Sequence, residues 1–201
     1  MTGFWTAPRI WERETVFVLA SGPSVNGLDL SLLAGRRVIA VKSSWLTYPA
    51  ADVLFFADGR WWKDPALRPK AFDGLIVSSA NEISDPRVKL VHKVEPGDLS
   101  ERPDTVALRR TSTTGAINLA VHFGASRIVL LGVDGKVAPE GARHCHGRPW
   151  PWPLKAGCFD EQAAEYRQIA PSAERLGVEI VNANPDSAID VWPRRPFSEC
   201  L

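Results

Sequence analysis

Seven short, nearly continuous apolar runs constrain the fold of this chain more than any other feature. They occupy residues 15–20, 37–41, 52–57, 74–78, 88–92, 127–132 and 178–182. Runs of this length, rich in Val, Ile and Leu, are typical of parallel strands that are covered on both faces. The sequence therefore predicts a sheet buried between two layers.

Helical patterns lie between several of these runs. A short one spans residues 28–33, a second spans 113–123 and stops at Gly124, and a third spans 159–176 and stops at Gly177. Pro171 is expected to kink or split the third helix. Strands that alternate with helices predict an α/β fold, a Rossmann-like, mostly parallel open sheet with helices on both faces. We expect a single domain over residues 1–201, with its core in 15–195.

Composition narrows the class of protein. The 201 residues are 45% hydrophobic and 23% charged, and the formal net charge is +1. That balance gives no overall attraction to nucleic acid or to an anionic membrane. No apolar run approaches the roughly 20 residues of a membrane span, and the first residues lack the order of a secretory signal. Three scattered cysteines, Cys145, Cys158 and Cys200, favour a reducing compartment, so we expect a cytoplasmic protein. A homo-oligomer is compatible with this composition.

Two stretches have no periodicity. Residues 93–103 are polar and contain two prolines and a glycine, and residues 136–157 contain four prolines and three glycines. Loops this long in a small domain are usually functional or disordered. The second stretch also carries two histidines, and we predict that it is a mobile functional loop.

Polar and small residues follow the predicted strands, where ligands bind in open α/β sheets. They are Ser21, Gly22, Pro23 and Ser24 after the first run, Lys42 and Ser43 after the second, Asp58 and Gly59 after the third, Thr113, Thr114 and Gly115 at the start of the long helix, and Asp134 and Lys136 after the sixth run. We expect the turn at Gly22 to offer free backbone N–H groups to a phosphate. These residues together predict a nucleotide site at one edge of the sheet.

Several of these residues could instead have a purely structural role. The hydroxyls at residues 111–114 also suit a helix cap, and Asp134 also suits bracing of a loop. Trp61 and Trp62 are expected mainly to pack in the core, and stacking on a base or a sugar is the alternative. These interpretations stay open at the level of sequence.

The histidines differ in their surroundings. His144 and His146 lie in the long loop, where either one suits general acid–base catalysis, because the unperturbed pKa of histidine is about 6.5. No neighbouring set of ligands completes a metal site, so we predict no metal-binding residues. His92 and His122 fall in periodic segments and are expected to pack.

Four motifs in order resemble one Rossmann-like superfamily. They are LASGPSV at residues 19–25, PAADVLFFADGRW at 49–61, TTGAINLA at 113–120 and IVLLGVD at 128–134. The superfamily contains the family 42 bacterial sialyltransferases, flagellin-modification proteins and archaeal hydroxymethylpterin pyrophosphokinases. Small phage and prophage members are the most similar, since they share the His-x-His-Gly loop and the tail at residues 178–193. The resemblance covers residues 15 to 195.

The resemblance implies roles for individual residues. Ser21–Ser24 would hold nucleotide phosphate and ribose, Asp58 would touch the donor, and Thr113–Gly115 would contact donor phosphate or sugar. His144 or His146 would act as the base. Ser21 and Lys42 replace asparagines that are usual in the sialyltransferases, and Lys136 replaces a tyrosine that supports the leaving phosphate. The two lysines fit a diphosphate electrostatically.

The leading hypothesis is a nucleotide-dependent transferase, glycosyltransferase-like, that uses a nucleotide-activated donor as its substrate and has no firmly implied cofactor. The loop histidine deprotonates the acceptor hydroxyl, Asp58 assists, and Lys136 or Arg143 stabilises the leaving phosphate. If a phage encodes the chain, it acts in the host cytoplasm, and a glycan or modified phage DNA is the acceptor. Arg143, Arg148, Trp150 and Trp152 would contact such a polymer.

Three other hypotheses stay open. A pterin pyrophosphokinase-like diphosphotransferase would use ATP with Mg²⁺ bound at Asp58 and Asp134. A non-catalytic nucleotide-binding module would need neither histidine. A structural phage protein fits the polar edge of the sheet less well.

Overall fold

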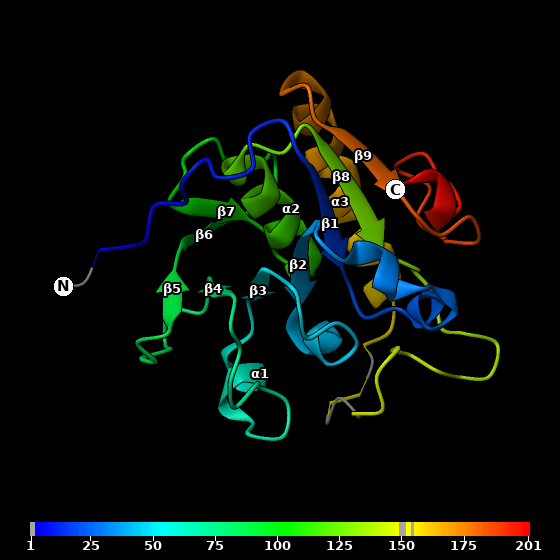
Figure 1. Ribbon diagram of the computed structural model, residues 1–201, viewed down its shortest axis with the longest axis horizontal. Coiled ribbons are helices and arrows are strands. Elements are labelled where there is room, and N and C mark those ends of the chain that lie inside the picture. The colour runs from blue at the N-terminus through cyan, green and yellow to red at the C-terminus, as the bar shows by residue number, and fades with distance from the viewer. Residues whose placement is uncertain (1–2, 149–151, 154) are drawn as a thin grey trace.

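A parallel sheet of seven strands forms the centre of the molecule (Figure 1). The computed structural model describes residues 3–148, 152–153 and 155–201. The strands of this sheet are β1 (Thr15–Leu19), β2 (Arg37–Val41), β3 (Val53–Phe56), β4 (Leu75–Ser78), β5 (Val88–Leu90), β8 (Arg127–Leu131) and β9 (Glu179–Asn182). Each apolar run of the sequence contributes one of them, so the predicted Rossmann-like α/β fold is confirmed.

The order of the strands in the sheet is β5-β4-β3-β2-β1-β8-β9, and every pair is parallel. The chain adds strands on one side of β1 up to β5 and then returns to place β8 on the other side of β1. The switch in strand order therefore lies between β1 and β8. In open α/β sheets a crevice forms at the carboxyl ends of the strands at this point.

Each face of the sheet has its own apolar core, because the side chains of one strand alternate between the two faces. Val16 and Val18 of β1 belong to the core under α2 (Ser112–Phe123) and α3 (Cys158–Arg175). Phe17 and Leu19 point to the opposite core. That second layer consists of α1 (Gly59–Lys63) and the 3₁₀ turns η1 (Pro23–Gly27), η2 (Leu30–Leu33), η3 (Lys42–Leu46) and η4 (Phe197–Glu199).

The helices agree with the sequence in place but differ in detail. The run predicted at residues 28–33 is a 3₁₀ turn, and Asp29 caps it by accepting a hydrogen bond from the amide of Ser31. The third helix is not split at Pro171, since α3 runs unbroken from Cys158 to Arg175. Among the described residues, no helix combines the length and the apolar character that a membrane span requires.

Two short strands were not predicted. The run at 88–92 divides into β5 and the start of β6 (His92–Val94), which pairs with β7 (Thr105–Ala107) in a separate two-stranded sheet. Both strands have only three residues, too few to give a sequence signal. The connection between them is the polar stretch that was expected to be functional or disordered.

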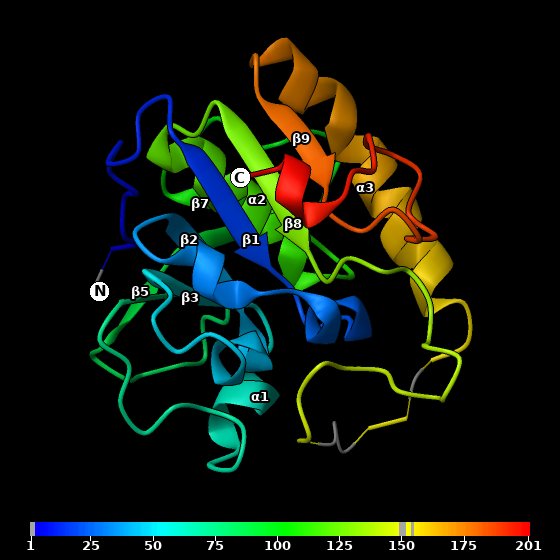
Figure 2. The same ribbon diagram turned by 45° about the vertical axis from the view of Figure 1, so that its right-hand side comes forward.

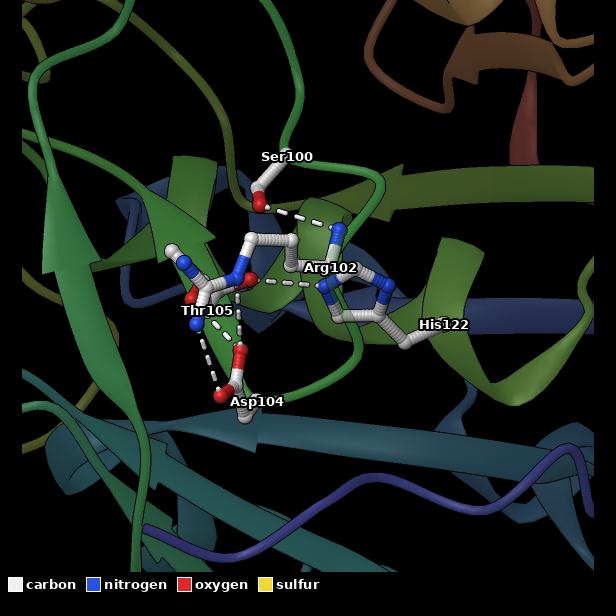
Figure 3. A network of polar contacts seen from close by, with 5 residues as sticks. All are labelled: Ser100, Arg102, Asp104, Thr105 and His122. Atoms are coloured by element: carbon white, nitrogen blue, oxygen red, sulfur yellow. Dashed lines mark hydrogen bonds and ion pairs between the residues drawn. The ribbon is translucent and has the colours of Figure 1, made fainter.

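Residues 98–107 are instead bound to α2 and α3 by buried polar side chains. The Asn118 side chain of α2 accepts hydrogen bonds from the amides of Ser100 and Ala107 and donates one to the carbonyl of Ser100. His122, one turn further along, contacts the carbonyl oxygen of Thr105 at 2.7 Å (Figure 3). Residues 98–107 are thus a structural strap, which corrects the expectation for this part of the stretch, and His122 has the packing role that was predicted.

Replacing Asn118 is expected to weaken the strap. In Asn118→Ala the buried amide of Ala107 and the partly buried amide of Ser100 lose their acceptor, so the free energy of unfolding should fall by about 2 to 3 kcal/mol. Urea denaturation measures the change, and Asn81→Ala, at an exposed position, is the matched control. Equal stability of the two variants would contradict this account of residues 98–107.

Candidate functional site

The candidate site lies at the carboxyl edge of the sheet. In Figure 2 the yellow-green loop after β8 passes beneath the arrowheads of β1 and β8, on the same side as α1. A cavity there has two adjoining lobes. The inner lobe, about 210 Å³, lies among Gly22, Gly132 and the start of α2, and the outer lobe, about 700 Å³, extends toward α1 and Lys93.

Most of the predicted site residues line this cavity. The inner lobe includes Ser21, Gly22, Lys42, Thr113, Asp134, Lys136 and His144, and the outer lobe includes Ser21, Lys42, Ser43, Asp58, Gly59, His144 and His146. Four of the predicted residues do not line either lobe, namely Pro23, Ser24, Thr114 and Gly115. A Cβ at Gly115 would meet the side chains of Leu108 and Phe55, and Thr114 is fully buried, so both belong to the packing of α2 on the sheet.

The turn after β1 is not an open set of amides. The N–H of Gly22 donates to the carbonyl of Gly132 at 2.9 Å, that of Ser24 to the carboxylate of Asp134, and that of Val25 to the carbonyl of Gly22. The expectation of free N–H groups is therefore wrong for these three residues. Gly22 is required for space, since a Cβ there would lie 2.4 Å from the carbonyl oxygen of Gly132.

Asp134 joins the ends of three strands. Its buried carboxylate accepts hydrogen bonds from the amide and the hydroxyl of Ser24, which follows β1, and from the side chain of Asn184, which follows β9. Asp134 itself follows β8. The bracing role that competed with ligand binding is therefore present, and it fixes the geometry of the inner lobe.

The first turn of α2 forms one wall of the inner lobe. Thr111 caps the helix by accepting a hydrogen bond from the amide of Thr113, as the alternative interpretation had it. Tyr166 of α3 contacts both threonine hydroxyls, and its burial raises the pKa of its phenol to about 12. The phenol therefore stays protonated and can donate a hydrogen bond.

Glu165, which sequence reasoning missed, holds the segment that leads into α2. Its carboxylate is only 3% exposed and accepts hydrogen bonds from the amides of Arg109 and Arg110. Both arginine side chains consequently lie at the cavity, Arg110 in both lobes. An acidic residue beside the apolar stripe of α3 was the available signal in the sequence.

Lys42 lies at the end of β2 with a backbone φ of +51°, in the left-handed region. Such a conformation is strained for a residue with a side chain and often occurs at functional sites. Lys42 lines both lobes, and burial lowers the pKa of its ammonium group, although the carboxylate of Asp58 acts in the opposite direction.

Asp58 caps α1 and is bound to an arginine. Its carboxylate accepts a hydrogen bond from the amide of Arg60 and forms an ion pair of 2.8 Å with the same side chain. Partial burial would raise the pKa of Asp58, but the hydrogen bonds from Arg60 and the charge of Lys42 prevail and lower it. The guanidinium of Arg60 also lies 4.6 Å from the ring centre of Trp152.

Trp61 and Trp62 pack, as expected. Trp61 is fully buried and donates a hydrogen bond from its indole to the hydroxyl of Ser43, and Trp62 stacks on Phe56 with ring centres 4.8 Å apart. Their rings are thus not available as platforms for a base. Trp150 lies outside the described residues.

The two loop histidines lie side by side. The rings of His144 and His146 stack with their centres 5.1 Å apart. Cys145 faces the other way toward Thr47, and its amide donates to the carbonyl of Ser21. That hydrogen bond attaches the loop to the turn after β1. His144 lines both lobes, and His146 lines the outer one.

Their surroundings keep both rings neutral. Burial, followed by the charges of Lys42 and Arg143, lowers the pKa of His144. Burial and the adjacent His144 ring lower the pKa of His146 to about 4. A neutral imidazole at pH 7 can accept a proton, which is the state that a general base requires.

The cavity concentrates positive charge in a chain that is nearly neutral overall. Its described lining contains nine basic residues and four acidic ones. The basic residues are Lys42, Arg60, Lys93, Arg109, Arg110, Lys136, Arg143, Arg148 and Lys155. Such an excess in a cavity attracts anionic ligands.

The carboxylates do not form a magnesium site. Asp58 is paired with Arg60, and Asp134 is occupied by hydrogen bonds from Ser24 and Asn184. Within the part of the chain that the structure describes, no group of three or more His, Cys, Asp or Glu side chains could hold a metal ion. The residues present therefore do not fit the metal that the diphosphotransferase hypothesis requires.

The low pKa of His146 is open to direct measurement. We expect its ring to titrate near pH 4 in ¹⁵N–¹H NMR spectra, with His146→Gln assigning the resonance. Histidine in an unfolded chain titrates near pH 6.5. The unfolded state thus binds more protons between about pH 6.5 and 4, and the free energy of unfolding falls as the pH falls through this window. A midpoint at or above 6.5 would contradict the environment described.

No protein-family model and no curated protein sequence matches this chain. Solved structures do. The MAf glycosyltransferase from Magnetospirillum magneticum AMB-1 aligns with a TM-score of 0.62 and 13% identity over 98% of this chain, which spans only 36% of that protein. The sialyltransferase CstII from Campylobacter jejuni, solved with cytidine-5'-monophosphate, aligns with a TM-score of 0.55 and 12% identity over 92% of this chain and 85% of its own. The chain thus has the same fold as these two glycosyltransferases.

Proposed function

We propose that this protein is a glycosyltransferase that moves a sugar from a nucleotide-activated donor to an acceptor hydroxyl. The observation that carries the proposal is a neutral histidine, His144, at the junction of the two lobes of a basic cavity. The fold shared with two glycosyltransferases supports the same reaction class, by analogy.

The inner lobe is assigned to the nucleotide phosphate of the donor. It combines the first turn of α2, whose partial positive charge favours anions, with Lys42, Arg110, Lys136 and Arg143. The hydroxyls of Thr111 and Thr113 and the phenol of Tyr166 supply further hydrogen-bonding groups. Asp134, which lines this lobe, keeps its shape through the hydrogen bonds that it accepts from Ser24.

The reaction needs one proton transfer and one displacement. The acceptor hydroxyl gives its proton to a ring nitrogen of His144 while its oxygen attacks the anomeric carbon. The bond from that carbon to the phosphate oxygen breaks, and its electron pair leaves with the nucleotide. Cations beside the phosphate stabilise the charge that develops there. Lys42 and Arg110 occupy both lobes and suit this role.

His144 is a better candidate for the base than His146. It alone of the two lines both lobes, where donor and acceptor would meet. His146, with a pKa of about 4, is the weaker base and stacks behind His144. Its role is then to fix the position of the His144 ring, on which it stacks. Asp58, bound to Arg60, contributes by holding that arginine at the cavity.

A thermal-shift screen tests ligand binding. Nucleotide sugars and their nucleotides should raise the melting temperature without added Mg²⁺, because ligand that binds only the folded state stabilises it. ATP that acts only with Mg²⁺ would favour a diphosphotransferase, against the proposal. If no nucleotide shifts the melting temperature, the proposal fails.

Substitution of the histidines separates an enzyme from a binding module. His144→Gln should lower turnover of the stabilising nucleotide sugar by about 10² to 10⁴-fold, the usual contribution of a general base, and keep its thermal shift. His146→Gln should lower turnover less. The control is His92→Gln, whose ring packs against Phe4 beside β6. Turnover in His144→Gln equal to that of the wild type would exclude His144 as the base.

A further inference from the structure

The outer lobe carries more positive charge than its own carboxylates can balance. Besides Lys42 and Arg110, which it shares with the inner lobe, it is lined by Arg60, Lys93, Arg109, Arg148 and Lys155. Its acidic lining residues are Asp58, Glu82 and Glu161. The inner lobe is also lined by four cations, the shared Lys42 and Arg110 together with Lys136 and Arg143, which are assigned to the donor phosphate. The charge in the outer lobe is therefore not explained by the donor.

Ion pairs account for only part of this charge. Arg60 pairs with Asp58, and Glu161 is shared between Arg110 at 3.3 Å and Lys155 at 3.7 Å. Lys93 and Arg148 form no ion pair with any described residue. Lys93 lies on β6, and Arg148 follows the histidines in the loop after β8, so the two come from separate parts of the chain.

We infer that the acceptor is an acidic saccharide, one whose terminal sugars carry a carboxylate or a phosphate, bound in the outer lobe. This inference rests on the proposed function, since it names the acceptor class of the same site. Lys93 and Arg148 meet the acidic group, and its attraction orients the acceptor so that a hydroxyl faces His144. Guanidinium and ammonium groups both bind carboxylates and phosphates, and the arginine can do so with two hydrogen bonds.

The lining favours a saccharide over a nucleic acid. Proteins that bind single strands stack the bases on aromatic side chains. Among the described residues that line the outer lobe, Trp61 is the only Trp, Tyr or Phe, and it is fully buried with its indole bonded to Ser43. Hydroxyl-rich sugars with an acidic group need no such platform.

The binding experiment compares three trisaccharides of equal length by isothermal titration calorimetry in 50 mM NaCl. An oligogalacturonate supplies carboxylates, a second trisaccharide ends in a sugar phosphate, and galactotriose is neutral. We expect at least one acidic trisaccharide to bind at least tenfold more tightly than galactotriose. Its affinity should fall as NaCl rises to 300 mM, because salt screens exposed charges. The stronger of the two acidic ligands identifies the anionic group.

Charge reversal locates the site. Lys93→Glu and Arg148→Glu should each weaken binding of the acidic trisaccharide at least tenfold, because each replaces an attraction by a repulsion. Lys89→Glu is the matched control, since Lys89 is exposed on the edge strand β5 and lies outside both lobes. This control variant should bind as the wild type does.

Three results would overturn the inference. The first is equal affinity for acidic and neutral trisaccharides. The second is complete displacement of the acidic trisaccharide by a nucleotide without a sugar, which would assign the cations of the outer lobe to the donor. The third is tighter binding of a single-stranded oligothymidylate at Lys93 and Arg148. A nucleotide thermal shift measured on the same wild-type sample keeps the two proposals apart, because its absence removes the proposed function whatever the saccharide does.

Discussion

The buried carboxylate of Asp134 is the interaction on which the site depends. It accepts hydrogen bonds from Ser24 and Asn184, and so connects the segments that follow β1, β8 and β9 at the switch point of the sheet. A buried charge is costly unless hydrogen bonds compensate it, and the three donors here do so. The same contact explains why Gly22 has no side chain, since a Cβ there would lie 2.6 Å from the Asp134 carboxylate.

Contacts that start at Asp134 position the other walls of the cavity. In the turn held by Asp134, the carbonyl of Ser21 accepts a hydrogen bond from the amide of Cys145. Because Cys145 lies between His144 and His146, this bond sets the position of both histidines. On the opposite wall Glu165 holds the backbone of Arg109 and Arg110 before α2. Two buried carboxylates therefore shape a cavity whose exposed surface is basic. These two carboxylates hold the backbone around the cavity, and the basic side chains of its lining face the space where a ligand would bind.

The sequence predicted the fold well because buried parallel strands leave a strong local signal. Each of the seven runs supplied one strand of the main sheet, and residues 113–123 became a helix one residue longer. Because the ends of these strands could be located, the sequence also predicted which edge of the sheet carries the cavity. The sequence could not separate residues that line the cavity from residues that support it. Ser24, Thr114 and Gly115 have the composition of a binding motif, but Ser24 binds Asp134, and Thr114 and Gly115 pack in the core. Glu165, Arg110 and the strap held by Asn118 depend on long-range contacts that no local pattern encodes.

A crystal structure with a bound nucleotide sugar tests the central claim most directly, namely that the basic cavity beside the neutral histidine holds an activated sugar donor. The account predicts the donor phosphate in the inner lobe, within hydrogen-bond distance of Arg110 or of the first turn of α2, and the anomeric carbon facing His144. A donor bound elsewhere on the molecule, or with its phosphate in the outer lobe against Lys93 and Arg148, would contradict it.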